Sequence, residues 1–215
     1  MNRMKLLKDG IFAAEKDFLA LEKMECAKAL VVSDSHGYSS MLKRIVETFY
    51  SEVQVLIFCG DGIYDLLSLD SKELPSVVVF VQGNNDPSSV SVQNGLLEKR
   101  IAVPKQVKIC ICKKNILVCH GNDCGVYYST SGVETVAQMK ECQAVLFGHT
   151  HVPCENMHTI YSMNPGSISS PRRSSKPSFA ILETNGNYIS SVFYGIEDGL
   201  NPKFIPYHPE NYWGL

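Results

Sequence analysis

Short apolar runs, rich in β-branched residues, alternate with helical patterns through the first half of the chain. The runs are apolar at successive positions, which is typical of parallel strands buried on both faces. Their spacing of roughly 25 residues leaves room for a helical crossover, as in right-handed βαβ units. The pattern predicts strands at residues 28–34, 53–61 and 77–84, with helices at 38–50 and 63–70 between them.

The second half of the chain has a more antiparallel pattern. Alternating runs on both sides of Lys114-Asn115 predict a hairpin that turns there. Asn185-Gly186, also between two alternating runs, strongly predicts another hairpin. A helix is expected around residues 132–142, followed by a strand at 144–151.

The first 27 residues mix charged and apolar positions in a helical pattern. Leu7, Ile11, Phe18 and Leu21 predict an apolar stripe along one amphipathic helix. No linker or repeat interrupts the chain that follows. The expected organisation is a helical extension at residues 1–27, one α/β domain at 28–196 and a tail at 197–215 that packs on the domain.

Composition and charge narrow the possible classes of protein. The chain has 215 residues, and its formal net charge of -2 argues against broad electrostatic binding to nucleic acid. No apolar run is long enough to span a bilayer and no signal-peptide pattern is present, so no membrane association is expected. Eight cysteines include Cys59 and Cys119 in strand-like runs, and the pair Cys110 and Cys112 on one strand face. They predict packed thiols in the cytoplasm, which is reducing, rather than a disulfide framework.

Six polar segments interrupt the apolar pattern, most of them directly after a predicted strand. Binding sites in α/β sheets assemble at the carboxyl ends of strands, and glycine lets the backbone approach a bound ion or phosphate closely. Singly the motifs are weak, because Gly-Asp or Asn-Asn is more often a turn. Together they contain four of the six histidines of the chain, which scattered core histidines would not do. The segments are Asp34-Ser35-His36-Gly37, Gly60-Asp61, Gly83-Asn84-Asn85-Asp86, His120-Gly121, Gly148-His149-Thr150-His151 and Asn164-Pro165-Gly166-Ser167.

Carboxylates, imidazoles and an amide in such segments match the ligands of a two-metal hydrolytic site. Two divalent cations about 3.5–4 Å apart can share a hydroxide and bind the ester oxygens during in-line displacement at phosphorus. One carboxylate must bridge the ions, and the metals lower the pKa of bound water so that hydroxide exists near neutral pH. The segments therefore favour hydrolysis of phosphate esters.

The six motifs follow one another in the order found in calcineurin-like metallophosphoesterases. The chain resembles this family over about residues 28–196, and most closely its small YfcE-type phosphodiesterase subgroup. The resemblance implies an α/β (α+β) fold with four αββα layers, in which two mixed β-sheets are flanked by helices.

The same resemblance implies that seven side chains bind two divalent metal ions. Manganese is the expected metal, with nickel, iron, zinc or cobalt as alternatives, because the ligand types alone do not select among them. Asp61 and His36 are also expected to act in catalysis. The expected ligands are Asp34, His36 and His151 for the first ion, Asn84, His120 and His149 for the second, and Asp61 as the bridge.

One position departs from the family pattern. Many members have a histidine directly after the ligand asparagine, where it resembles a general acid, but this chain has Asn85, whose amide cannot serve as one. We therefore expect a phosphodiesterase that prefers activated leaving groups. Asn84 is also expected to contact the substrate, and Arg172 or Arg173 to bind a phosphate oxygen, although solvated loop charges explain these arginines equally well. Asp86 is expected to orient its loop or a ligand imidazole.

Two alternatives remain open from the sequence. One is a phosphomonoesterase, including a protein phosphatase. The other is a non-catalytic scaffold that binds proteins with the same fold, although a scaffold could lose metal ligands and this chain keeps a full set. The expected partner is a small phosphoester, and a homodimer is the commonest oligomer for such a chain.

Overall fold

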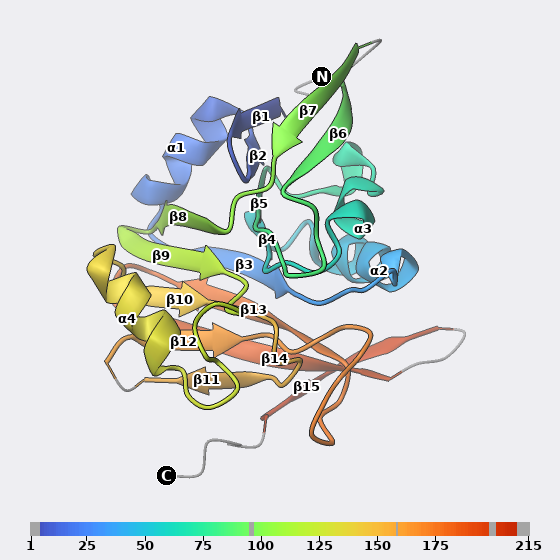
Figure 1. Cartoon of the computed structure of the whole chain (residues 1–215). Helices are drawn as coiled ribbons and strands as arrows, with labels where there is room; N and C mark the ends of the chain where they lie inside the picture. The colour runs from blue at the N-terminus through green and yellow to red at the C-terminus, as the bar shows by residue number, and fades with distance from the viewer. Residues whose placement is uncertain (1–4, 95–96, 158, 198–200, 210–215) are drawn as a thin grey trace.

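The computed structural model describes residues 5–94, 97–157, 159–197 and 201–209. Two β-sheets pack face to face, and helices cover their outer faces (Figure 1). Helices α2 (Ser39–Phe49) and α3 (Ile63–Leu67) lie on the larger sheet, and α4 (Ser131–Met139) lies on the smaller one. These are the four αββα layers implied by the family resemblance, so that prediction is confirmed.

The larger sheet has eight strands, and its centre is parallel. Neighbouring strands β3, β4 and β5 run in the same direction, as the apolar runs of the first half predict. The strands that flank this centre are antiparallel to it. In spatial order the strands are β1 (Lys5–Lys8), β2 (Ile11–Ala13), β5 (Val77–Phe80), β4 (Val55–Phe58), β3 (Ala27–Val32), β13 (Ser178–Thr184), β14 (Ile189–Glu197) and β15 (Lys203–Tyr207).

The smaller sheet has five strands and is mixed rather than mainly antiparallel. Strand β10 pairs in parallel with both β9 and β12, which the alternating pattern of the second half did not indicate. In spatial order the strands are β11 (Cys154–Asn156), β12 (Tyr161–Asn164), β10 (Ala144–Leu146), β9 (Lys114–Cys119) and β8 (Gln106–Ile111).

Successive residues of the central strands point into different cores. In β3, Val31 lies in the core between the two sheets, whereas Leu30 packs in the core beneath α2. A third core, which includes Val145 of β10 and Val133 of α4, joins the smaller sheet to its helix. Because side chains alternate across a strand, a strand between two apolar layers needs apolar residues at every position.

The prediction of one helix over the first 27 residues was wrong. Residues 5–13 form a hairpin, in which β2 adds to the edge of the larger sheet beside β5, and only α1 (Glu15–Lys23) is helical. Gly10 has φ 77°, which a tight turn requires, and Ile11 is fully buried opposite Val79. The helical spacing of Leu7 and Ile11 is therefore coincidental, and pairing with the sheet decides the structure.

Two other local predictions differ from the structure. The hairpin between β8 and β9 turns at Cys112-Lys113, two residues before the predicted place, and both residues have positive φ, as a type I′ turn requires. Cys112 is buried in this turn rather than on the strand face of Cys110. The segment predicted as a tail contributes β15, which pairs with β14 at the sheet edge.

The sequence interpretation missed a separate pair of antiparallel strands at residues 89–94 and 97–102. Strand β6 (Ser89–Asn94) pairs with β7 (Leu97–Ala102) outside both large sheets. In the described residues, no helix is long and apolar enough to cross a membrane.

Candidate metal centre

The predicted site residues meet where the two sheets present the carboxyl ends of their parallel strands. Asp34 and Asp61 follow β3 and β4 of the larger sheet. His120 and His149 follow β9 and β10 of the smaller sheet. Parallel pairing within each sheet brings its strand ends to one edge, and packing of the sheets brings the two edges together.

Five of the seven predicted ligands have left-handed backbone conformations. This region is uncommon for residues other than glycine and costs of order 1–3 kcal/mol at each position. The surrounding structure must therefore hold these side chains where they lie, a feature typical of binding and catalytic sites. The residues and their φ angles are Asp34 (53°), His36 (43°), Asp61 (59°), His149 (70°) and His151 (60°).

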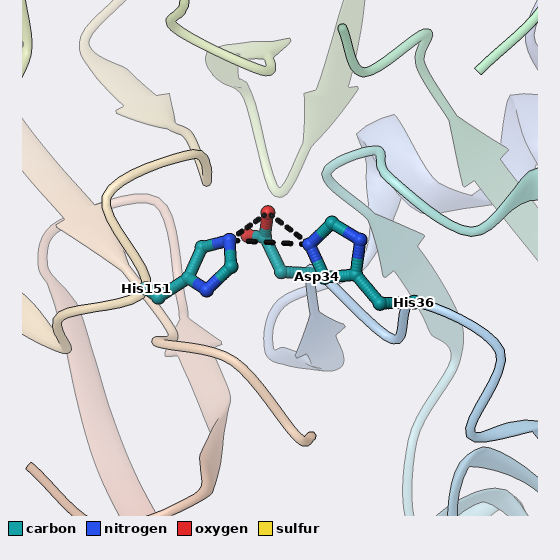
Figure 2. Close-up of side chains that lie close together, drawn as sticks. All are labelled: Asp34, His36 and His151. Carbon is teal, nitrogen blue, oxygen red and sulfur yellow. Dashed lines mark hydrogen bonds and ion pairs between the residues drawn. The ribbon is translucent and has the colours of Figure 1, made fainter. Parts of the chain in front are cut away.

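Asp34, His36 and His151 form the first cluster. Figure 2 shows both imidazole rings turned toward the carboxylate of Asp34. The Nε2 atoms of His151 and His36 lie 3.2 and 3.7 Å from Oδ1 of Asp34, and 3.2 Å from each other. Asp34 is fully buried and His36 remains open to solvent, so the cluster lies at the floor of an accessible site.

Asp34, Asp61 and His120 form a second cluster that shares Asp34 with the first. Nε2 of His120 lies 3.4 Å from Oδ2 of Asp61 and 4.0 Å from Oδ1 of Asp34. The same nitrogen is 3.1 Å from Oδ1 of Asn84. His36 connects the two clusters, because its Nε2 is 3.8 Å from Oδ2 of Asp61.

Backbone carbonyls orient two of these imidazoles. Nδ1 of His120 lies 2.8 Å from the carbonyl oxygen of Cys59, and Nδ1 of His151 lies 2.6 Å from that of Ser170. Because a carbonyl only accepts, each Nδ1 carries the proton, and each Nε2 points into the site. When Nε2 is also protonated, the ring is an imidazolium that faces the carboxylates. When Nε2 is not protonated, its lone pair can bind a cation held between the carboxylates.

The carboxylate of Asp34 fits the role of a metal ligand. Its Oδ2 accepts hydrogen bonds from Oγ of Ser33 at 2.6 Å and from the backbone N–H of His149 at 3.1 Å. Its Oδ1 is buried, yet no described residue donates a hydrogen bond to it in suitable geometry, even though His151 is close. A buried carboxylate oxygen without a donor is costly unless a cation binds it. The donor set therefore fits a divalent metal.

The electrostatics of the centre favour positive charge. Burial raises the pKa of Asp34, but contacts with His151 and His36 outweigh it and hold that pKa well below its usual value. Burial likewise opposes ionisation of Asp61, yet His120 and the hydrogen bonds from Asn85 lower its pKa. Both carboxylates are therefore anionic near neutral pH, as metal ligands must be.

His120 and His149 differ although they are neighbours. Burial lowers the pKa of His120, but contact with Asp61 and the charge of Asp34 outweigh it and raise that pKa. Burial and the charge of His120 lower the pKa of His149, whose ring lies 5.1 Å from the ring of His120 between centroids. His149 is thus beside the second cluster, but it is not among the carboxylate and imidazole groups that converge in either one.

Asn85 and Asp86 organise the loop around Asp61. Asn85 donates to both oxygens of Asp61, from its backbone N–H and from Nδ2, each at 2.7 Å. Asp86 accepts hydrogen bonds from four backbone N–H groups, at 2.7–3.0 Å. Asp86 therefore orients its loop, which is one of the two roles expected for it. The four N–H groups belong to Asp61, Gly62, Ile63 and Gly83.

Asp65 is a positioning residue that the sequence interpretation missed. It lies in α3 and is largely buried, and its Oδ2 accepts hydrogen bonds from Oγ of Ser35 at 2.5 Å and from the backbone N–H of Gly37 at 2.8 Å. These contacts hold both neighbours of His36. The sequence shows only that an acidic residue lies four positions after Asp61. Without the fold, this spacing does not indicate a role for Asp65.

The Asn164-Ser167 loop lies beside the centre. Nδ2 of Asn164 donates to the carbonyl of Gly148 at 2.6 Å, and Oγ of Ser167 donates to the carbonyl of Asp34 at 2.7 Å. The loop therefore ties the segment that carries His149 and His151 to the segment that carries Asp34.

Arg172 reaches the centre through Tyr127, another residue without a sequence motif. Nη1 of Arg172 donates to the hydroxyl of Tyr127 at 2.6 Å, and the ring of Tyr127 packs against His149 at 4.9 Å between centroids. A small pocket of about 50 Å³ is lined by Tyr127, Arg172 and Thr150. Arg173 lines the same pocket.

Comparison with known proteins agrees with this geometry. Residues 28–187 match the calcineurin-like phosphoesterase superfamily domain. The chain is 30% identical over 168 residues to a Bacillus subtilis protein described as the probable metallophosphoesterase YsnB, covering 77% of this chain and 89% of that protein. It is 27% identical over 173 residues to phosphodiesterase YfcE of Escherichia coli, covering 74% and 88% respectively.

Solved structures share the fold. A protein from Streptococcus pneumoniae described as a predicted phosphoesterase has a TM-score of 0.64 and 25% identity, covering 86% of this chain and 99% of that one. Vacuolar protein sorting 29 of Cryptosporidium parvum has the same TM-score and coverage at 19% identity, a likeness of fold alone.

The fold and the clustered carboxylates and imidazoles define a metallophosphoesterase, a metal-dependent hydrolase of phosphate esters. The chain belongs to the calcineurin-like phosphoesterase superfamily. The family resemblance seen in the sequence motifs is thereby confirmed.

Proposed function

We propose that this protein is a phosphodiesterase that hydrolyses small phosphodiesters with two divalent metal ions. The observation that carries the proposal is the buried Oδ1 of Asp34. No described residue donates a hydrogen bond to it in suitable geometry, and three imidazole Nε2 atoms surround it at 3.2–4.0 Å. The proposed ligands are Asp34, His36 and His151 for one ion, Asn84, His120 and His149 for the other, and Asp61 as the bridge.

Divalent cations bound there would act as Lewis acids and lower the pKa of a coordinated water. The chain's own residues would set the conditions for that chemistry. Asp34 and Asp61 supply two negative charges against the charge of the ions, which leaves a positive centre that attracts a phosphate ester. His36, the exposed ligand of the first cluster, would face the substrate together with Asn84.

Arg172 would bind a phosphate oxygen. The guanidinium of Arg172 has five N–H donors. Its hydrogen bond to the Tyr127 hydroxyl uses one nitrogen, Nη1, so other donors are left for a phosphate oxygen. Tyr127 packs on His149, so this contact keeps Arg172 beside the centre. Arg173, in the same small pocket, is the second residue proposed to contact substrate.

A diester substrate is favoured over a monoester. Asn85 occupies the position of the family's general acid, and its Nδ2 is engaged with Oδ2 of Asp61. It therefore supports Asp61 instead of donating a proton to a leaving group. Esters with good leaving groups need no such donor, and the relative from Escherichia coli is named a phosphodiesterase.

Manganese is the proposed metal, with nickel, iron, zinc and cobalt as alternatives, because mixed carboxylate, imidazole and amide ligands accept all of them. A cytoplasmic location is proposed from the cysteines, all eight of which lie in the described part of the chain as free thiols. A homodimer is proposed on general grounds of symmetry.

Metal-dependent turnover of matched aryl esters tests the proposal. Protein freed of metal with a chelator and reloaded with Mn²⁺ should cleave bis(p-nitrophenyl) phosphate faster than p-nitrophenyl phosphate. A reversed preference would support a monoesterase. Binding of two Mn²⁺ per chain by titration calorimetry without any turnover would support a non-catalytic scaffold, and binding of none would exclude the metal centre.

A further inference from the structure

A pocket of about 510 Å³ lies away from the proposed metal centre, on the outer side of the larger sheet. Three segments surround it: the N-terminal hairpin of β1 and β2, the chain from α3 through η1 (Ser71–Glu73) to Leu74, and the paired strands β6 and β7. None of its lining residues is a proposed metal ligand. They are Lys5, Leu6, Phe12, Leu66, Leu67, Leu69, Ser71, Leu74, Val78, Ser91, Val92, Lys99 and Ile101.

The floor of the pocket is fixed by the core beneath it. Val78 and Ile101 are 1% and 3% exposed, and Phe12 stacks on Phe80 with 5.1 Å between ring centroids. The upper part is different, because Leu69 and Val92 are only partly buried at the edge of this core. An apolar ligand would remove that surface from water, worth about 25 cal/mol for each Å² buried.

The charged side chains that line the pocket in the described residues are both positive. Lys5 of β1 and Lys99 of β7 are its charged lining residues in the described part of the chain, and no carboxylate lines it. Glu73, which lies next to Leu74, has its Oε2 3.8 Å from Nζ of Lys43 instead. An apolar floor with two ammonium groups is complementary to a molecule that has an apolar body and an anionic group.

We propose that this pocket binds a small amphipathic carboxylate, with its apolar chain on the floor and its carboxylate near Lys5 and Lys99. Its volume lies within the roughly 300–1,000 Å³ typical of small-molecule sites, which favours such a ligand over a folded protein partner. The N-terminal hairpin, which lies outside the residues that match the calcineurin-like family, forms part of the pocket together with β6 and β7. The proposal does not depend on the metal centre.

Titration calorimetry with decanoate, below the concentrations at which it forms micelles, tests the proposal. Decanoate should bind one site per chain, whereas acetate and decyltrimethylammonium should bind at least about fivefold more weakly, because one lacks the chain and the other the anion. Equal binding of the cation, or no binding of decanoate, would overturn the proposal.

Variants of the pocket locate the site. Val92→Trp should fill the pocket and abolish decanoate binding, and Lys5→Gln/Lys99→Gln should weaken it about fivefold. Lys140→Gln/Lys203→Gln, the same charge change directly after α4 and in β15, is the matched control and should bind as the unmodified protein does. Each variant should keep its circular dichroism spectrum and melting transition. Decanoate binding that survives Val92→Trp in a folded protein would place the ligand elsewhere and refute the assignment.

Discussion

Nη1 of Arg172 donates a 2.6 Å hydrogen bond to the hydroxyl of Tyr127, although 45 positions separate the two residues in the chain. Tyr127 lies in the segment that follows His120, and Arg172 lies in the segment that follows Ser167. The hydroxyl of Tyr127 also donates to the carbonyl of His149 at 3.4 Å, and the backbone N–H of Arg172 donates to the carbonyl of His151 at 3.2 Å. Two loops from different strands are therefore fastened to the same Gly-His-Thr-His segment.

This relationship predicts a selective defect in Tyr127→Phe. The variant keeps the ring that packs on His149 but loses the contact that holds Arg172. A hydrogen bond to a charged group contributes about 1.5–3 kcal/mol, and partial exposure reduces this, so KM for a diester should rise about three- to tenfold. The kcat and the stoichiometry of Mn²⁺ binding should not change. Tyr128→Phe, at a hydroxyl on an 89% exposed side chain, is the control. An unchanged KM in Tyr127→Phe would refute a role for this pair in substrate binding.

Replacing Asp61 tests the proposed bridge between the metal ions. Asp61→Asn keeps the shape of a side chain that is 2% exposed, but it removes the negative charge and one acceptor. We expect hydrolysis of bis(p-nitrophenyl) phosphate to fall at least about a hundredfold, because ligand changes weaken metal binding and remove the charge balance of the centre. Asp123→Asn, at an exposed pair with Lys105, should retain full activity. Undiminished turnover by a folded Asp61→Asn protein would disprove the bridge.

Residues in local motifs were predictable, and residues that act across the fold were not. An apolar strand directly precedes each of the ligands Asp34, Asp61 and His120. Because binding sites assemble at the carboxyl ends of strands, the local sequence was sufficient to predict that these side chains lie together. Tyr127 and Asp65 make their contacts with distant segments and belong to no motif, so nothing local distinguishes them from surface or helix residues.

The fold shows the same division between local and non-local information. The parallel strands of the first half were identified because a strand buried on both faces has a continuous apolar run. The N-terminal hairpin was missed because only its pairing with β5 decides between strand and helix. The β6–β7 pair was missed despite a readable pattern, since Ser89, Val90, Ser91 and Val92 alternate as a half-buried strand does.

The four backbone N–H groups bound by Asp86 predict a stability effect as well as a functional one. Asp86→Asn keeps the size of the side chain but replaces part of the acceptor set with an amide NH₂ that faces backbone N–H groups. We expect a loss of about 2–4 kcal/mol in the free energy of unfolding, measured by urea denaturation, with reduced metal affinity because the loop of Asp61 loosens. Asp70→Asn is the matched control, since Asp70 accepts from one exposed N–H, that of Lys72, and should lose less than about 1 kcal/mol. Equal losses in the two variants would show that Asp86 has no special role in the loop.

Burial predicts a fixed order of reactivity among the thiols. The thiolate is the reactive form, and burial raises the pKa of Cys59 and Cys119 far above the usual value for a thiol. Cys26 is exposed directly before β3, so reagents can reach it. Iodoacetamide at neutral pH should therefore modify Cys26 first in the native protein and leave Cys59 and Cys119 unmodified, as peptide mass spectrometry would measure. In urea all three should react at similar rates, which confirms that folding and not local sequence protects them. Cys59 lies two residues before Asp61, and its carbonyl holds His120, so early modification of Cys59 in the native state would mean that the floor of the metal centre opens far more readily than the packing described above permits.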